Sequence, residues 1–244
     1  MKVTLFGSSI VSSYWNGAAT YYRGICKALS KLGYELVFVE PDAYQRQQHR
    51  DLLSDPEYIE VRVTRSWDEL ERELKAAQGS DLVAKCSGVG VFDDLLEERV
   101  AGMAGDALTA FWDVDAPTTL EKAFSEPGWY FSKLVPKFDT ILTYGGGPAV
   151  QKGYGTLGAR AVHLVYNAVD PDEYAPAEPS EEYRCDLMLM ANRLPDREER
   201  IKSIFFAAAE LAPDQEFILG GEGWGDYPFP RNVRYIGHVP TALH

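Results

Sequence analysis

The sequence contains few of the residues that bind zinc or form disulfides. Three of its 244 residues are cysteines and four are histidines, and they are scattered along the chain. Cys26, Cys86 and Cys185 form no Cys-x-x-Cys pair and no cluster with a histidine. We therefore expect neither a metal site nor a disulfide framework.

Long apolar runs are also missing. No run approaches the roughly 18 apolar residues of a membrane-spanning helix. The apolar start of the chain, residues 1–7, is interrupted by Ser8 and Ser9 and is too short for a secretory signal. These absences predict a cytoplasmic protein with no membrane span.

Positive charge is in the minority. The chain has 24 Lys and Arg against 37 Asp and Glu, a formal net charge of -13. An acidic surface repels nucleic-acid backbones and anionic membranes, so we expect no nucleic-acid partner. The charge leaves room for a local basic pocket, because a few arginines can dominate a cleft. With 45% hydrophobic residues, the chain can build an ordinary globular core.

Short apolar runs alternate with amphipathic stretches through the first two thirds of the chain. Apolar strands that alternate with helices predict an α/β fold with a parallel sheet covered on both faces. The strands are expected at 3–7, 35–40, 81–86, 108–112, 138–144 and 162–166, with an extra strand at 58–63 left open, and the helices at 20–32, 67–77 and 92–103.

A stretch rich in proline and acidic residues follows this first pattern. We interpret residues 169–182 as a linker between a domain at 1–168 and a second domain at 183–244. The second domain is expected to hold strands at 185–190, 216–219 and 233–236 and a helix from Pro195 to about Leu211. Nucleotide-binding domains of this class usually need about five or six strands, so we expect this second Rossmann-like domain to be incomplete.

The loop after the first expected strand lacks the dinucleotide-binding fingerprint. Gly7 is followed by Ser-Ser-Ile-Val instead of the G-x-G-x-x-G pattern, which disfavours an NAD enzyme. The loop still lies at the carboxyl end of a strand, where parallel sheets bind ligands.

Several segments match one known family in order along the chain. One of these segments, residues 111–117, reads Phe-Trp-Asp-Val-Asp-Ala-Pro and forms an aromatic-Asp-x-Asp-x-Pro pattern. Together they resemble the CgeB-like glycosyltransferases, a family named for a spore maturation protein. The segments are residues 6–9 with 15–24, 111–120, 144–148, 190–200, 219–224 and 232–239.

The resemblance implies a GT-B fold, in which two Rossmann-like domains face each other. It implies transfer of a sugar from a UDP-, GDP- or dTDP-sugar to an acceptor hydroxyl, without a metal ion or another cofactor. Two departures stand out. Ala18 occupies a position where family members often carry histidine, and the acidic helix that grips the donor ribose in the family is absent from this sequence.

Arginines and glycines in the second domain are the candidates for the donor site. Arg193 and Arg197 follow a strand and precede a helix, where a guanidinium fork and free N–H groups suit a diphosphate. The alternative is a solvated capping cluster. Further candidates are Gly220, Gly221 and Gly223, which allow close backbone approach, and His238, which the resemblance places near the nucleobase and which is otherwise a plain turn residue.

The first domain supplies two other groups of candidates. Ser8, Asn16, Gly17 and Thr20 could bind a donor phosphate or the acceptor sugar, although the same residue types suit a helix-capping loop.

Asp113 and Asp115 are the candidate catalytic residues. In an extended segment they would project to the same side, and two like charges raise the pKa of one of them. They would equally suit a divalent metal ion, and Asp115 would equally suit a helix cap.

Three functions remain open at this point. The first is a GT-B glycosyltransferase. The second is a non-catalytic module that binds a sugar or an acceptor without a complete donor site. The third is another enzyme built from two Rossmann-like domains, such as an epimerase. A free sheet edge in the second domain would favour homo-oligomers.

Overall fold

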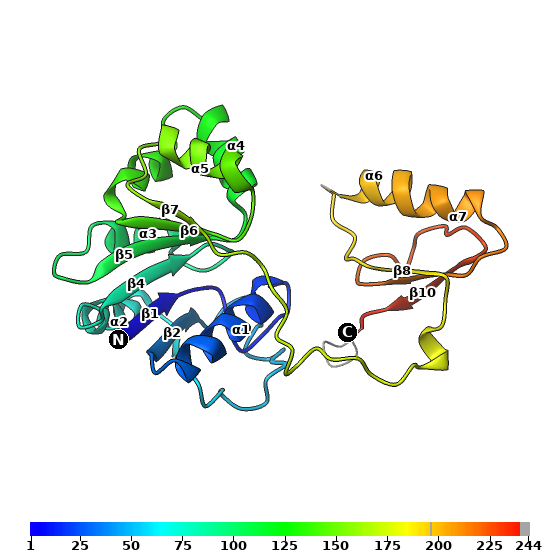
Figure 1. Cartoon of the computed structure of the whole chain (residues 1–244), viewed down its shortest axis with the longest axis horizontal. Helices are drawn as coiled ribbons and strands as arrows, with labels where there is room; N and C mark the ends of the chain where they lie inside the picture. The colour runs from blue at the N-terminus through cyan, green and yellow to red at the C-terminus, as the bar shows by residue number, and fades with distance from the viewer. Residues whose placement is uncertain (196, 240–244) are drawn as a thin grey trace. The chain divides into compact units, whose positions relative to one another are not determined.

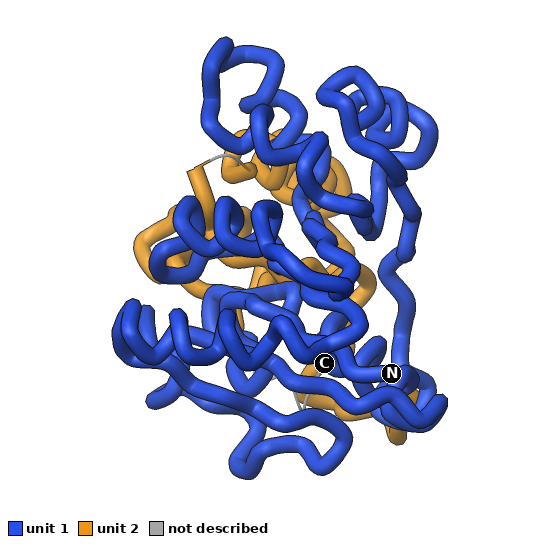
Figure 2. Tube along the Cα trace, turned by 90° about the vertical axis from the view of Figure 1, so that its left-hand side faces the viewer, with its two compact units in different colours: residues 1–174 blue, residues 175–244 orange. Residues whose placement is uncertain are grey.

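The computed structural model describes residues 1–195 and 197–239. The chain divides into two compact units, Met1–Tyr174 and Ala175–His244 (Figure 2). The boundary falls inside the stretch predicted as a linker, whose first residues belong to unit 1. None of the described helices is both long and apolar enough to cross a membrane.

Unit 1 is built on a parallel sheet of seven strands in the order β3-β2-β1-β4-β5-β6-β7 (Figure 1). The predicted α/β class and parallel sheet are therefore confirmed, and the strand left open near residue 60 is present as β3. The strands are β1 Lys2–Phe6, β2 Glu35–Pro41, β3 Glu60–Thr64, β4 Leu82–Cys86, β5 Leu108–Asp113, β6 Thr140–Thr143 and β7 Val162–Leu164.

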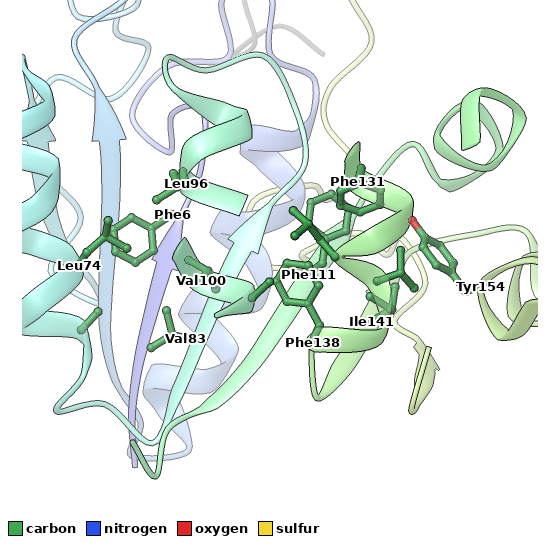
Figure 3. Close-up of a cluster of buried hydrophobic side chains, with 14 of the residues drawn as sticks. Phe6, Leu74, Val83, Leu96, Val100, Phe111, Phe131, Phe138, Ile141 and Tyr154 are labelled. Atoms are coloured by element: carbon green, nitrogen blue, oxygen red, sulfur yellow. The ribbon is translucent and has the colours of Figure 1, made fainter. Parts of the chain in front are cut away.

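Helices cover both faces of this sheet. One face carries a core formed with α2, α3, α4 and α5, and the other carries a core formed with α1. Figure 3 shows the first core, where Phe111 packs against Phe131 and Phe138. The helices are α1 Ala18–Lys31, α2 Trp67–Ala77, α3 Asp93–Ala101, α4 Ala116–Ser125 and α5 Gly147–Thr156.

Local signals in the sequence set several helix ends. The Ser66 hydroxyl accepts the Glu69 N–H at 3.2 Å and caps α2 as predicted. Gly33 follows α1 with a φ of +85°, a conformation that glycine adopts without strain. The sequence does not predict helix α5, because this helix begins with Gly147 and Pro148 and contains two more glycines.

The strand order reverses between β1 and β4. The chain runs from β1 outward to β2 and β3, then returns to β4 on the other side of β1 and continues to β7. The loops after β1 and β4 therefore diverge at the carboxyl edge, and this crevice is where doubly wound sheets bind ligands. The first residues of the two loops still lie against each other before the chain runs to α1 on one face and α3 on the other, since a Cβ on Gly88 would lie 2.5 Å from Ser8 Oγ.

The described residues of unit 2 form three parallel strands in the order β10-β9-β8. They are β8 Leu187–Met190, β9 Phe217–Gly220 and β10 Val233–Gly237. One helical stretch joins β8 to β9; it consists of α6 Glu198–Ile201, a π-helical segment Lys202–Phe206 and α7 Ala207–Leu211. Phe205, Phe206 and Trp224 anchor its core, which is separate from those of unit 1.

The end of unit 1 is held against α1 by ion pairs. Lys27 Nζ lies 2.9 Å from Asp170 Oδ2 and 3.4 Å from Asp172 Oδ2, and Lys31 Nζ lies 2.9 Å from Asp172 Oδ2. The Tyr21 hydroxyl donates to the Val165 carbonyl at 2.7 Å. We call residues 165–174 the strap, because these contacts hold the last residues of unit 1 against α1.

Removing the cations should loosen the strap. In a Lys27→Met/Lys31→Met variant, the amides of Asp172, Glu173 and Tyr174, which are bonded within the strap, should exchange with deuterium several-fold faster. A smaller acceleration should appear in wild type at high salt, because salt screens the exposed Lys31–Asp172 pair more than the half-buried Lys27–Asp170 pair. Lys137→Met is the control, and unchanged exchange in the double variant would show that the ion pairs do not hold the strap.

Candidate functional site

A buried carboxylate organises the loop after β1. Glu40, at the end of β2, is fully buried and accepts hydrogen bonds from the Ile10 amide at 2.6 Å, Ser9 Oγ at 3.0 Å and Gln47 Nε2 at 2.6 Å. Burial raises the pKa of Glu40 above its ordinary value, and these hydrogen bonds oppose that shift. The carboxylate thus holds the loop in place through donors from two segments of the protein.

An ion pair between the buried Arg23 and the more exposed Asp51 adds a second contact that holds the same loop. Arg23 of α1 donates through Nε to the Ile10 carbonyl at 2.6 Å and binds Asp51 through both terminal nitrogens, at 2.6 and 3.0 Å. Burial alone would raise the pKa of Asp51, but the Arg23 guanidinium and the Ser13 amide hold it below its usual value. The bidentate geometry fixes both partners.

The predicted binding residues of this loop are placed as follows. Ser8 is buried, Asn16 and Thr20 are half-buried, and Gly17 is exposed at the N-cap of α1. The Asn16 amide donates to the carbonyls of Ser9 at 2.7 Å and Ser12 at 3.2 Å, so its side chain shapes the loop itself. Gly17, with no side chain, provides no cap, and the capping role expected of this segment falls to the Asn16 carbonyl, which accepts the Ala19 amide at 3.2 Å.

Asp113 ends β5 inside the protein. Its carboxylate is fully buried and accepts the Tyr154 hydroxyl of α5 at 2.5 Å and the Asp115 amide at 2.8 Å. Burial raises the pKa of Asp113, while the bonds from Tyr154 and Asp115 oppose the rise. Figure 3 shows Tyr154 at the border of the core.

The carboxylate pair expected from the period-two spacing is not formed. Asp115 is exposed at the N-cap of α4, whereas Asp113 is buried. The physical reason is that the chain turns into α4 after Asp113 instead of continuing as an extended strand, so the two side chains do not share one side. The raised pKa of Asp113 comes from burial, and no like charge is needed to explain it.

The loops after the strands of unit 2 are tied together by hydrogen bonds. The Ala191 amide donates to the Gly220 carbonyl at 2.8 Å, the Gly221 amide to the Gly237 carbonyl at 2.7 Å, and the Glu222 amide to Asn192 Oδ1 at 2.8 Å. Segments predicted separately as candidates therefore meet at the carboxyl edge of this sheet.

The glycines make this approach possible. Gly221 has a φ of +129°, and a Cβ there would lie 2.2 Å from the Ala191 carbonyl oxygen. Gly223 has a φ of +86°, and its Cβ would lie 3.2 Å from Arg193 Cβ, while a Cβ on Gly220 would meet Met190 Sδ at 2.5 Å. At Gly221 the close approach is to the backbone of Ala191, and the Gly221 N–H is already used within the protein. Close approach of these glycines to a ligand stays a prediction.

Arg193 lies in the centre of this group of loops. Its guanidinium donates to both oxygens of Glu198, at 2.9 and 3.3 Å, and to Asp226 at 2.9 Å. It also lies over the rings of Trp224 and Tyr227, at 5.6 and 5.5 Å from their centroids. Hydrogen bonds from Arg193 and Lys202 lower the pKa of Glu198 to about 2, so this carboxylate stays charged.

The other predicted residues of unit 2 are nearer to solvent. Arg197 is exposed at the N-cap of α6, and His238 is exposed with its Nδ1 3.9 Å from Glu222 Oε1. The capping cluster considered as the alternative is partly present, since Arg193 binds Glu198 of the first helical turn. Asp196, a member of that cluster, lies outside the described residues.

Sequence reasoning missed several buried polar groups. Glu40, Arg23, Lys85 and Tyr154 are all at most 5% exposed, and each forms a hydrogen bond inside unit 1. The signal for Glu40 was present, since an acidic residue ended a strand of four apolar residues. Nothing in the sequence around Tyr154 pointed to Asp113, which lies 41 residues earlier.

Metal ligands do not gather in the part of the chain that the structure describes. Across residues 1–195 and 197–239, no three side chains of His, Cys, Asp or Glu lie close enough together to hold an ion.

Two solved structures match nearly the whole chain. An alpha-glucosyltransferase in complex with UDP and a 13-mer DNA matches 93% of this chain with a TM-score of 0.62 and 12% identity. The catalytic domain of starch synthase IV from Arabidopsis thaliana, bound to ADP and acarbose, matches 99% of it with a TM-score of 0.66 and 11% identity. This chain spans 58% of the length of the first and 75% of the second.

A third match has another chemistry. A putative UDP-N-acetylglucosamine 2-epimerase from Listeria monocytogenes matches 99% of this chain, which spans 70% of it, with a TM-score of 0.54 and 13% identity. No model of a protein family matches the sequence, and the search of curated proteins finds no match. The comparisons therefore show the GT-B fold, and the resemblance to CgeB-like proteins stays a prediction.

The prediction of no nucleic-acid partner now rests on charge alone. A protein of this fold is bound to DNA in one of the matching structures. The fold therefore gives no reason to exclude nucleic acid.

Removing the Tyr154 hydroxyl should destabilise the protein in a pH-dependent way. Tyr154→Phe takes one donor from the buried Asp113 carboxylate, which should cost about 1–3 kcal/mol of unfolding free energy when Asp113 is charged. Because the pKa of Asp113 is raised in the folded state, protonation at low pH favours folding and needs this donor less. The loss measured by urea denaturation should thus be larger at pH 7 than near pH 4, with Tyr166→Phe as an exposed control. An equal loss at both pH values would contradict this account.

Proposed function

We propose that this chain belongs to a metal-independent glycosyltransferase that moves a sugar from a nucleotide-sugar donor to an acceptor hydroxyl. The observation that carries the proposal is the position of Arg193, held among three loops at the carboxyl edge of the unit 2 sheet. The GT-B fold supports it, because a UDP complex and an ADP complex are among the matching structures.

The surroundings of Arg193 suit a ligand that carries a diphosphate. Glycosyl transfer builds negative charge on the leaving diphosphate, and preorganised donors stabilise that charge. Glu198 fixes the orientation of the guanidinium through two bonds, whereas Asp226 is 84% exposed and holds only one nitrogen. A phosphate oxygen would replace Asp226 at Nη1, because exposed ion pairs contribute little.

The fold supports a division of roles in which unit 1 receives the acceptor. Asp115 is the exposed carboxylate at the carboxyl edge of β5, and we assign to it the orientation of the acceptor hydroxyl. Asp113 acts through Asp115, since it binds the Asp115 amide and is itself buried. Asp113 is thus a positioning residue in this proposal.

The pairing of Arg193 also favours a second candidate function. Its guanidinium already binds two carboxylates, which is what a structural arginine would do in a non-catalytic module. Such a module would bind a sugar or an acceptor and no nucleotide. The two functions therefore differ in nucleotide binding. Membership of the CgeB-like family and a cytoplasmic location remain parts of the proposal that rest on the sequence.

Nucleotide binding is tested by calorimetric titration of the chain with UDP, GDP and dTDP. One of them should bind, and Arg193→Ala should weaken it about tenfold to a hundredfold, the effect of losing a charged hydrogen bond of roughly 1.5–3 kcal/mol. Asp226→Ala should bind at least as tightly as wild type, because it frees Nη1.

Arg184→Ala provides the matched control, since Arg184 is exposed and pairs with Glu181 in the same unit. Binding of a sugar such as maltose by a chain that takes up none of the three nucleotides would favour the non-catalytic module. Undiminished nucleotide binding by Arg193→Ala would remove Arg193 from the site.

A further inference from the structure

A cavity of about 130 Å³ lies at the carboxyl ends of the first four strands of unit 1. Val39, Leu70 and Leu96 form its apolar side, and Asp42, Lys85 and Asp93 supply charged groups. It lies on the sheet face that carries α2 and α3, beside the point where the strand order reverses. None of the residues considered above for the donor or the acceptor lines this cavity.

The buried ammonium of Lys85 has bonding capacity left for a ligand. Lys85 is 2% exposed, and its Nζ lies 2.7 Å from the Cys86 carbonyl and 3.0 Å from Asp93 Oδ1. Glu97 Oε1 is 4.0 Å away, beyond hydrogen-bond distance. An ammonium carries three N–H groups, and the described residues place two acceptors within reach of them. Burying a donor without a partner is costly, so a ligand hydroxyl would complete this set.

Phe92 is held in an unfavourable backbone conformation at the same cavity. Its φ of +61° lies in the left-handed region, which is strained for a bulky side chain. The ring lines the cavity, packs edge-on against Trp67 at 5.5 Å and remains 39% exposed. Strain of this kind is often kept at sites that bind ligands. The exposed ring offers an apolar platform for the C–H face of a sugar ring.

Charge and size decide which ligand fits. Among the charged residues that line the cavity, Glu40, Asp42 and Asp93 are acidic, and Arg65 and Lys85 are basic. Lys85 is already paired with the half-buried Asp93, and the three carboxylates outnumber the two cations, so the lining disfavours a phosphate. Pockets for drug-sized ligands have roughly 300–1,000 Å³, which leaves room here for about one ring and not for a nucleoside.

We infer that this cavity binds one ring of a neutral polyol, such as a hexose or a cyclitol. In this arrangement Lys85 Nζ donates to one ring hydroxyl, the Asp42 carboxylate accepts from another, and the ring lies against Phe92. The inference goes beyond the proposed function, because the site belongs to unit 1 and needs neither a nucleotide nor Arg193.

The test titrates the chain, without nucleotide, with myo-inositol and with methyl α-D-glucopyranoside, followed by ligand-observed NMR. A dissociation constant on the order of millimolar is expected for one of these small ligands. Phe92→Gly should weaken binding roughly fivefold to tenfold through loss of the ring contact, although glycine relieves the strain at that position. Asp42→Asn should weaken binding about tenfold through loss of a charged acceptor.

Gln45→Gly is the matched control. Gln45 also has a left-handed φ, of +58°, and does not line the cavity, so this change relieves similar strain and should leave binding intact. Thermal unfolding of each variant shows that it is folded. The inference is overturned if neither polyol binds, if inorganic phosphate or adenosine binds in their place, or if Phe92→Gly and Asp42→Asn bind as well as wild type. None of these results bears on nucleotide binding by Arg193, which the separate titration with UDP, GDP and dTDP tests.

Discussion

The fully buried carboxylate of Glu40 is the contact on which the ligand edge of unit 1 depends. It joins the end of β2 to the loop after β1 through Ser9 and Ile10, and to residues 42–49 through Gln47. A buried carboxylate is tolerated only when hydrogen bonds replace the lost water, and here three donors do so. The loop after β1 therefore has one preferred position, which Arg23 of α1 and its partner Asp51 stabilise further. A rigid loop at the reversal of strand order is what a binding site on a parallel sheet requires.

In unit 2 the carboxyl-edge loops are held by backbone contacts instead of a buried charged side chain. Gly221 lets the turn after β9 lie directly on the loop after β8, and the Gly237 carbonyl accepts its amide from the third loop. Trp224 then fills the space beneath, with its indole N–H donating to the Ala191 carbonyl at 2.8 Å. Arg193 lies on this platform, so its direction is set by Glu198 and by two aromatic rings. Both units thus fix their carboxyl-edge loops before any ligand arrives.

Periodicity in the sequence was enough to predict most of the fold. Buried parallel strands are short continuous apolar runs, and Leu-Val-Phe-Val in β2 and Thr-Ala-Phe-Trp in β5 could be recognised without knowing their neighbours. Helix α5 could not be recognised in this way, because its glycines have low helix propensity. The packing of Val150 and Tyr154 on the sheet stabilises it in the folded protein. The order of the strands, and with it the cavity beside Phe92, depends on pairings between residues far apart in the chain.

The sequence predicted which candidate residues lie at the carboxyl ends of strands, because parallel strands bring those ends to one edge of each sheet. Whether these loops bind a ligand stays a prediction. The partners of each side chain were not predictable, since Asp113 meets Tyr154 and Arg193 meets Asp226 only through the tertiary fold. The pairing expected between Asp113 and Asp115 failed because the spacing argument assumed an extended chain, and the chain turns into α4 there.

The most direct test of the account is a map of the residues that a nucleotide touches. In an amide NMR spectrum of the labelled chain, addition of UDP, GDP or dTDP should shift the signals of residues 191–194, 221–224 and 237–239. Signals of the strap and of α2 should stay in place. Shifts confined to unit 1, or no shifts with any of the three nucleotides, would contradict a donor site built around Arg193.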